Sequence, residues 1–256
     1  MKDEDRKAMD PEEKLLDVLE KLLKVDEGAY VSVSHVCNEF QYLFIQTSKM
    51  KETAQKFGSV IFMDTTYKIN KNQMPVSVLM VMDGHGNGRP VGYAFLANET
   101  ADTYIAMLKD FRGNVGEESS AEKTQTFLID KDPAEAKSIT EVYPEVDIQL
   151  CDFHVSRTFS KRSSKEPPRV REIIDTLRFT SNDEDFENLV VELEKESSNE
   201  FFTYFKENWL SCPLSWSRRD KKKSINLGQN TTNLVENHNA KLKMVKFFFI
   251  FFILCQ

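Results

Sequence analysis

The sequence predicts an α/β domain built on a mixed five-stranded sheet, with flanking helices and a helical insertion before the last helix. Between residues 57 and 151, apolar segments alternate between strand and helix patterns in the order β-β-β-α-β-α-β. From Pro167 onwards, the apolar residues recur only at helical spacing. The chain has 256 residues, of which 40% are hydrophobic, so it is long enough to bury a substantial core.

The N-terminal part of the chain, residues 1–56, is expected to be a helical accessory segment. Leucines and a valine recur at helical spacing between Pro11 and Lys24. Acidic residues stand before them, where they favour the start of a helix.

Three strand-like segments follow, at residues 60–67, 76–82 and 91–97. The glycine-rich segment 83–88 predicts a tight turn between the second and third strands, which makes them antiparallel. Asp83 opens this segment, so we expect it to serve the turn.

The next elements are a helix at 102–111, a strand at 126–129, a helix at 133–142 and a strand at 147–151. Asp132 precedes a proline and is expected to cap the second of these helices. Helical crossovers imply that the first, fourth and fifth strands run parallel. This is the strand order of the ribonuclease H fold, in which the first and fourth strands lie side by side. We therefore assign residues 57–162 to a ribonuclease H-like core.

The segment 163–230 is expected to be a helical insertion in this core. The core resumes at 231–246, where a last helix starts near Asn233 and carries an acidic residue. Residues 247–256 are an apolar tail, too short to cross a bilayer, which takes about 20 apolar residues. The tail is more typical of a truncation artefact, such as a translated intron, than of an anchor, and no membrane partner is expected.

The formal net charge of −7 is not typical of a nucleic-acid-binding protein, but net charge averages over segments, and bases are concentrated in the segments 153–178 and 216–246. These segments are where contacts with phosphates are expected. The candidate residues are Arg157, Lys161, Arg162, Arg218, Arg219, Lys241 and Lys243. The basic run 218–223 fits either a nuclear import signal or a solvated loop.

The four cysteines, Cys37, Cys151, Cys212 and Cys255, are widely spaced and form no C-x-x-C pair. A disulfide framework is therefore not expected, and a reducing compartment is favoured. The first thirteen residues are mostly charged, so they do not resemble a signal peptide. The expected location is the nucleus or, failing that, the cytoplasm.

Three acids are the best clue to function. Two apolar runs end on Asp64 and Asp130, and Glu236 follows within T-T-N-L-V-E-N-H-N. A carboxylate at the end of a buried strand is costly to desolvate unless it is paired or bound to a cation. Because the first and fourth strands lie side by side, Asp64 and Asp130 are expected to be neighbours. Three such acids suit Mg²⁺ or Mn²⁺, and a pair of these ions catalyses phosphoryl transfer.

Each of these acids also has a structural explanation. Asp64 can cap the turn that follows it, and Asp130 can be an ordinary surface residue. Glu236 stands three residues after Asn233, which is the spacing of a capping box. The equivalent positions of the two aspartates on adjacent strands favour the metal site.

Cys151 and His154 have the C-x-x-H spacing of half a zinc site. The later sequence offers no matching half, because His238 is the only later histidine and Cys212 has no neighbouring ligand. A role in lining or packing the acidic site is favoured, and no zinc site is expected in this chain.

Five phrases resemble the transposase domain of Mutator-like elements, and in particular its domesticated form in the zinc finger SWIM-type proteins one and three. They are F-M-D-T-T-Y-K-I-N, D-G-x-G-x-G-R-P-V-x-Y-A-F, L-I-D-K-D-P-A-E, I-Q-L-C-D-F-H-V and T-T-N-L-V-E-N-H-N, and the likeness runs from about residue 40 to 245. It implies a ribonuclease H-like DDE domain in which Asp64, Asp130 and Glu236 match the acidic triad. Cys151 and His154 match the C-x-x-H element that follows the second acid.

SWIM-type relatives carry a C-x-C-x(n)-C-x-H zinc finger beyond this domain, and Mutator-like elements carry an N-terminal zinc module that reads DNA. The sequence contains neither pattern, so no zinc function is carried over.

Three functions are compared. The first is a DDE-type transposase or nuclease that cleaves or transfers DNA phosphodiesters with metal. The second is a domesticated, non-catalytic nuclear protein that uses the fold to bind nucleic acid or protein. The third, an unrelated structural or adaptor protein, leaves the strand-end acids unexplained. The intact triad favours metal binding, whereas the missing DNA-reading modules favour domestication. Turnover and oligomeric state stay open.

Overall fold

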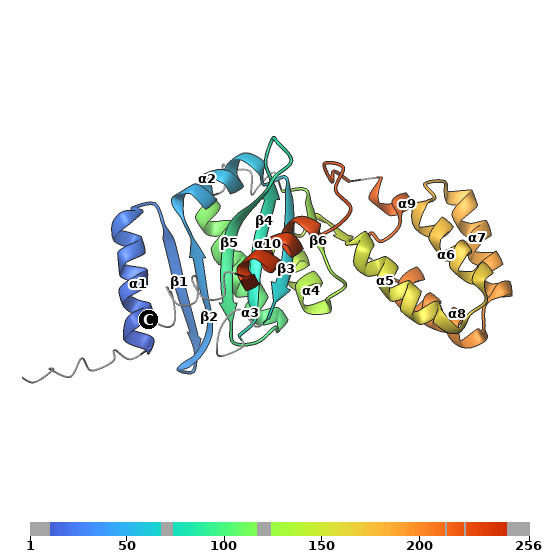
Figure 1. Ribbon diagram of the computed structural model, residues 1–256, viewed down its shortest axis with the longest axis horizontal. Coiled ribbons are helices and arrows are strands. Elements are labelled where there is room, and N and C mark those ends of the chain that lie inside the picture. Colours follow the sequence, from blue (N-terminus) through green and yellow to red (C-terminus); the bar gives the residue numbers. More distant parts are fainter. Residues whose placement is uncertain (1–10, 68–73, 117–123, 213, 223, 245–256) are drawn as a thin grey trace, which may run out of the picture.

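The structure is a computed structural model that describes residues 11–67, 74–116, 124–212, 214–222 and 224–244 (Figure 1). The apolar tail, Cys255 and Lys223 of the basic run lie outside the described residues.

The strands described form one mixed sheet in the order β1-β2-β5-β4-β3-β6-β7. They span Tyr30–Val36 (β1), Glu39–Gln46 (β2), Val60–Thr66 (β3), Val76–Met82 (β4), Gly88–Leu96 (β5), Thr126–Ile129 (β6) and Asp147–Leu150 (β7). The helices are Pro11–Val25 (α1), Ser48–Phe57 (α2), Ala101–Val115 (α3), Pro133–Val142 (α4), Asp152–Arg162 (α5), Pro168–Phe179 (α6), Asp183–Glu196 (α7), Asn199–Phe205 (α8), Arg218–Lys221 (α9) and Asn233–Met244 (α10).

The sheet has seven strands among the described residues, so the expectation of five was wrong. Residues 30–46 of the expected helical segment form the hairpin β1–β2, and β2 pairs antiparallel with β5. The hairpin turn is Cys37-Asn38, both with positive φ (50° and 64°), which matches the twist of the two strands. A cysteine rarely takes this conformation, and no glycine signals the turn. The strand β1, Y-V-S-V-S-H-V, is also half polar, as suits an edge strand.

The predicted strand directions are confirmed. β3, β6 and β7 are parallel neighbours, whereas β4 runs antiparallel to both β3 and β5. Phe62 of β3 is in register with Leu128 of β6. Asp64 and Asp130 each stand two positions further on, so the two acids reach equivalent positions at the same edge of the sheet.

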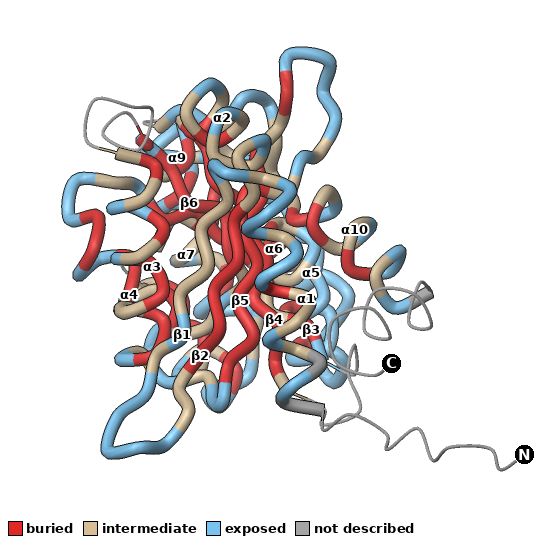
Figure 2. The backbone as a smooth tube through the Cα atoms, turned by 90° about the vertical axis from the view of Figure 1, so that its left-hand side faces the viewer, coloured by how far each residue is buried: buried red, intermediate tan, exposed pale blue. Residues whose placement is uncertain are grey.

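Helices cover both faces of the sheet, and Figure 2 shows the buried strands between them. One face packs against α2, α3 and α4 in the larger hydrophobic cluster. The other face packs against α1 and α10, through Leu19 and Val235. The helix predicted between Pro11 and Lys24 is thus present as α1, and it contributes to the second core.

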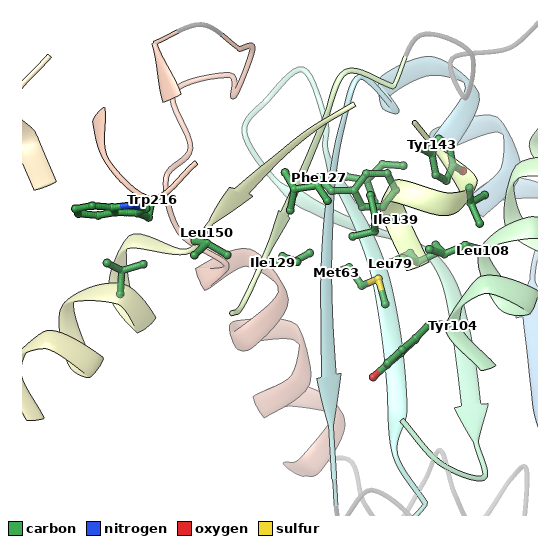
Figure 3. Packing of buried hydrophobic residues seen from close by; sticks show 14 of the residues in the cluster. Met63, Leu79, Tyr104, Leu108, Phe127, Ile129, Ile139, Tyr143, Leu150 and Trp216 are labelled. Atoms are coloured by element: carbon green, nitrogen blue, oxygen red, sulfur yellow. The ribbon is translucent and has the colours of Figure 1, made fainter. Parts of the chain in front are cut away.

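Strand alternation decides which face each site residue reaches. Met63 and Ile129 belong to the larger cluster, and Figure 3 shows them in that core beside Leu79. Asp64 and Asp130 are the next residues, so they lie on the opposite face, the one covered by α10. Thr65 then returns to the face of α3.

The helices α6 to α9 form a lobe beside the sheet, to the right in Figure 1. The lobe packs against α5 through a set of tilted and edge-on aromatic rings, namely Phe159 of α5 with Phe186, Phe205, Trp209 and Trp216. The lobe joins the sheet where Leu150 of β7 donates its backbone N–H to the carbonyl of Ser215. Among the described helices, none has the length and apolar character needed to span a membrane.

Candidate functional site

Asp64 and Asp130 lie at the carboxyl ends of the adjacent strands β3 and β6. Both side chains are half-buried. Burial, followed by the charges of Asp130 and Glu236, raises the pKa of Asp64 to about 6. The two predicted neighbours therefore meet, and the charged form of Asp64 is disfavoured unless a cation joins it.

Glu236 reaches this edge of the sheet from α10, which begins at Asn233 as expected. Its Oε1 lies 3.7 Å from Nδ1 of His154, and the same Nδ1 lies 2.6 Å from Oδ1 of Asp130. Glu236 also accepts a 3.0 Å hydrogen bond from the hydroxyl of Thr232, the residue before the helix. Glu236 thus combines a local contact at the helix start with a place beside the other acids.

Asn239 is a site residue that the sequence interpretation missed. Its Nδ2 donates a 2.5 Å hydrogen bond to Oδ2 of Asp64, and its side chain is buried. Its other amide atom, Oδ1, has no hydrogen-bond partner among the described residues. The i,i+3 spacing from Glu236, which puts both residues on one side of α10, was the available signal.

Cys151 and His154 lie beside Asp130 because α5 starts directly after β7. Cys151 is the residue before α5, and His154 falls one helical turn later, on the same side. Sγ of Cys151 accepts hydrogen bonds from the backbone N–H and the hydroxyl of Thr232, at 3.3 and 3.2 Å. Both residues thus lie beside Asp130, and their role in lining the site stays a prediction.

The charges of this group are strongly coupled. The Asp130 carboxylate, and after it Cys151, raises the pKa of His154 to about 10. Burial works to raise the pKa of the Cys151 thiol, but His154 and Thr232 outweigh it and leave that pKa below its ordinary value. The imidazole is therefore positively charged at neutral pH, next to three acids.

A second unpredicted residue, the acid Glu135, lies near Asp64 on the other face of the sheet. It is buried, and its Oε1 accepts a hydrogen bond of 3.3 Å from the hydroxyl of Thr65. Thr65 in turn is 2.9 Å from the hydroxyl of Tyr104. Burial, then the charges of Asp132 and Asp64, raises the pKa of Glu135 well above its ordinary value. Its position in the first turn of α4, after the confirmed cap Asp132, gave no hint of burial.

The predicted phosphate-binding residues fall into two groups. One group is exposed to solvent: Arg157 and Lys161 on α5, Lys241 and Lys243 on α10, and Arg218 on α9. Arg162 is exposed but stacks on Tyr204, at 4.6 Å from the ring centroid. Arg219 is half-buried, stacks 3.7 Å above the Phe186 ring and pairs with Glu187 at 3.2 Å, so it belongs to the lobe's own packing.

The basic run 218–223 is not a freely solvated loop along its described length. Lys221 is buried and donates to Oδ1 of Asp152 at 2.5 Å and to the carbonyl of Leu150 at 2.6 Å. It thereby ties α9 to the junction between β7 and α5, where Cys151 lies.

Asp83 has the turn role that was predicted, since it accepts hydrogen bonds from the backbone N–H groups of His85 and Asn87.

The donor atoms at this edge suit a cation. Asp64, Asp130 and Glu236 offer the oxygen ligands that Mg²⁺ and Mn²⁺ prefer. Oδ1 of Asp130 and Oδ1 of Asn239 are buried without an aligned hydrogen bond in the described part of the chain, as expected where an ion or water completes the site.

The sequence profile described as "Zinc finger SWIM domain-containing protein 1/3, RNaseH-like domain" matches residues 20–149. Protein FAR1-RELATED SEQUENCE 5 of Arabidopsis thaliana is 24% identical over 135 residues, which is 51% of this chain and 17% of that protein. Protein FAR1-RELATED SEQUENCE 4 of the same plant is 25% identical over 113 residues, 44% of this chain and 15% of that protein. A PKS-NRPS hybrid synthetase, cheA, of Chaetomium globosum is 20% identical over 221 residues, 75% of this chain and 5% of that protein.

The chain spans less than a fifth of the length of each of these relatives. The profile match covers half of the chain and includes Asp64 and Asp130, while Cys151, His154 and Glu236 lie beyond it. With its mixed sheet and its strand-end acids, the chain belongs to the RNase H-like domain family of zinc finger SWIM domain-containing proteins 1 and 3, a region derived from Mutator-like transposases.

Proposed function

We propose that this chain is a DDE-type domain that holds Mg²⁺ or Mn²⁺ through Asp64, Asp130 and Glu236 and acts on DNA phosphodiesters. The observation that carries this proposal is the meeting of three acids from β3, β6 and α10 at the carboxyl edge of two parallel strands. Such a cluster of half-buried carboxylates is unfavourable without a cation. The reaction class is hydrolysis or strand transfer.

Bound metal would supply the Lewis acid that activates an attacking oxygen and stabilises the leaving one. Residues beside the acids would hold the carboxylate ligands in position. The Asn239 amide holds Asp64 in one orientation from the side of α10. On the other face of the strand, Glu135 contacts the same segment of β3 through the hydroxyl of Thr65, and burial raises the pKa of Glu135.

The surroundings of the acids favour a phosphate backbone as substrate. The starts of α5 and α10 converge here, because Asp152 donates its N–H to the carbonyl of Asn230 and Thr232 contacts Cys151. Helix N-termini attract phosphate groups. The exposed bases Arg157 and Lys161 on α5, and Lys241 and Lys243 on α10, would then bind further phosphates along DNA.

A domesticated, non-catalytic nuclear protein is the second candidate, and one observation favours it. The imidazolium of His154 lies 2.6 Å from Asp130 and 3.7 Å from Glu236, so the chain carries a positive charge of its own at the acids. Charge compensation of this kind can hold the fold without metal. The fold would then serve to bind nucleic acid or a protein partner.

Thermal unfolding against Mn²⁺ concentration separates the two candidates. The wild-type chain should gain about 2.7 kcal/mol at 100 times the dissociation constant. The Asp64→Ala/Asp130→Ala variant should gain nothing. If both proteins respond alike, the metal site is refuted and the non-catalytic candidate stands.

DNA cleavage then tests the activity. Nicking of supercoiled plasmid in Mn²⁺ should be lost in Asp64→Asn and kept in Asp102→Asn, whose carboxylate is exposed on α3. Nicking by Asp64→Asn at the wild-type rate would refute the catalytic assignment.

The nuclear location is proposed for both candidates. A fluorescent fusion of the full chain should enter the nucleus, and Arg218→Ala/Lys222→Ala, which changes only exposed residues of the basic run, should leave it in the cytoplasm. Equal distribution of both fusions would count against the import signal.

A further inference from the structure

We infer that Asp130, Cys151 and His154 form a binding site for Zn²⁺. It differs from the proposed Mg²⁺ or Mn²⁺ site in its sulfur and nitrogen ligands, and the ligands that the two sites can share are the acids Asp130 and Glu236. One carboxylate oxygen, Sγ and one imidazole nitrogen all lie within 4.8 Å of one another. They come from the end of β6, the residue before α5 and the first turn of α5. This proposal departs from the expectation that the chain has no zinc site.

The distances suit a tetrahedral zinc ion after a small adjustment. Zinc binds thiolate at about 2.3 Å and imidazole or carboxylate at about 2.0–2.2 Å, so tetrahedral ligand atoms are roughly 3.3–3.8 Å apart. Asp130 and His154 are closer than this, at 2.6 Å, and would separate around an ion. Glu236, at 3.7 Å from the imidazole, can supply the fourth ligand, as can water.

Two of the three donor atoms already contact each other directly. Oδ1 of Asp130 and Nδ1 of His154 are buried and make no aligned hydrogen bond in the described chain, although they are in close contact. Their contact at 2.6 Å brings a carboxylate oxygen and an imidazole nitrogen together as two ligands of one ion would be, and zinc binding would release the imidazole proton to solvent.

The groups around Cys151 fit a metal-bound thiolate. Thr232 directs both its backbone N–H and its hydroxyl at Sγ, and such outer hydrogen bonds are usual around metal-binding thiolates and imidazoles. The hydroxyl proton is shared, because the same oxygen lies 3.0 Å from Oε1 of Glu236. Thr232 therefore connects the thiolate to the fourth candidate ligand.

The donor set selects the metal. A sulfur and an imidazole nitrogen favour zinc, whereas Mg²⁺ and Mn²⁺ favour oxygen ligands alone. The side chains of Asp130 and His154 are 31% and 29% exposed, so an ion has a path from solvent. Cys151 is completely buried, which argues against the other use of a Cys-His-Asp group, a nucleophilic thiol that must reach its substrate.

The sequence alone does not indicate this site, because it contains no second Cys or His pair after His154. The third ligand is a carboxylate that β6 supplies through space. Asp130 would then be shared between the two metal classes, so zinc would compete with Mg²⁺ or Mn²⁺ for this carboxylate.

Zinc binding is tested on the full chain without an affinity tag, by titration with Zn²⁺ against a chromogenic chelator and by the visible and near-ultraviolet spectrum with Co²⁺. The wild type should bind one ion and give the intense thiolate-to-cobalt band of tetrahedral coordination. Cys151→Ser should bind at least 10-fold more weakly and lose the band, while Cys212→Ser should match the wild type.

Further variants keep the test decisive. If Cys151→Ser fails to fold, His154→Ala serves instead because His154 is partly exposed, with His85→Ala as its control. Unchanged binding by the folded variants, or no binding by the wild type, would overturn the inference. Asp64→Asn should keep zinc binding and lose stabilisation by Mn²⁺, so failure of the zinc site and failure of the acidic site give different results.

Discussion

The amide of Asn239 on α10 donates a 2.5 Å hydrogen bond to the carboxylate of Asp64 on β3, across a sequence separation of 175 residues. This bond joins α10 to β3 at an acid whose charged form is disfavoured by burial. Oδ1 of the same amide is buried and has no hydrogen-bond partner in the described chain. The geometry of the proposed site thus depends on a residue outside the acidic triad.

Asn239→Ala should therefore weaken Mn²⁺ binding by about 10- to 100-fold, the usual effect of losing a group that orients a metal ligand. Isothermal titration of the full chain measures it. Asn237→Ala is the matched control, because Asn237 is exposed two residues earlier on α10. Equal affinity in both variants would show that Asn239 does not position Asp64.

The pKa of Asp64 gives a stability prediction with a definite sign. Its pKa rises from an ordinary 3.8 to about 6 on folding, so the folded chain holds a proton that the unfolded chain has lost between these values. Stability should fall as pH rises through this window, and the full penalty, at most about 3 kcal/mol, remains above pH 6.

Asp64→Asn removes this penalty. In a chelator, the variant should be more stable than the wild type at pH 8 and gain nothing at pH 4, where Asp64 is already neutral. Chemical denaturation at the two pH values measures the difference, with Asp102→Asn as control. An equal gain at both pH values would show that charge at Asp64 is not the cause.

The sequence located the two strand-end aspartates because hydrophobic runs have clear ends and because parallel strands impose register. It could not locate Asn239, since an asparagine on a polar helix face looks solvated until its partner on a distant strand is known. The same limit hid Lys221, whose partner Asp152 is far away in the sequence. The β1–β2 hairpin was missed for a local reason, because its turn uses Cys37 where glycine or asparagine is usual.

Lys221→Met should destabilise the fold by about 2–4 kcal/mol, because it removes two buried charge-assisted hydrogen bonds and leaves Asp152 without its cation. Arg218→Met, an exposed change on the same helix, should alter the free energy of unfolding by less than about 0.5 kcal/mol. Urea denaturation of both variants measures the contrast. A Lys221→Met variant as stable as Arg218→Met would mean that α9 is not anchored at the start of α5.

The exposed bases predict a salt-dependent affinity for DNA. Each lost phosphate contact lowers the slope of log affinity against log salt by about 0.9, so Arg157→Ala/Lys161→Ala should lower it by roughly 2. Arg219→Ala should leave the slope unchanged and lower the melting temperature instead, because this guanidinium stacks on Phe186 and pairs with Glu187 inside the lobe. Fluorescence anisotropy with a labelled duplex in chelator, at several salt concentrations, separates the two effects. If Arg219→Ala reduces the slope and the α5 variant does not, the phosphate-binding surface lies on the helical lobe and away from the acids.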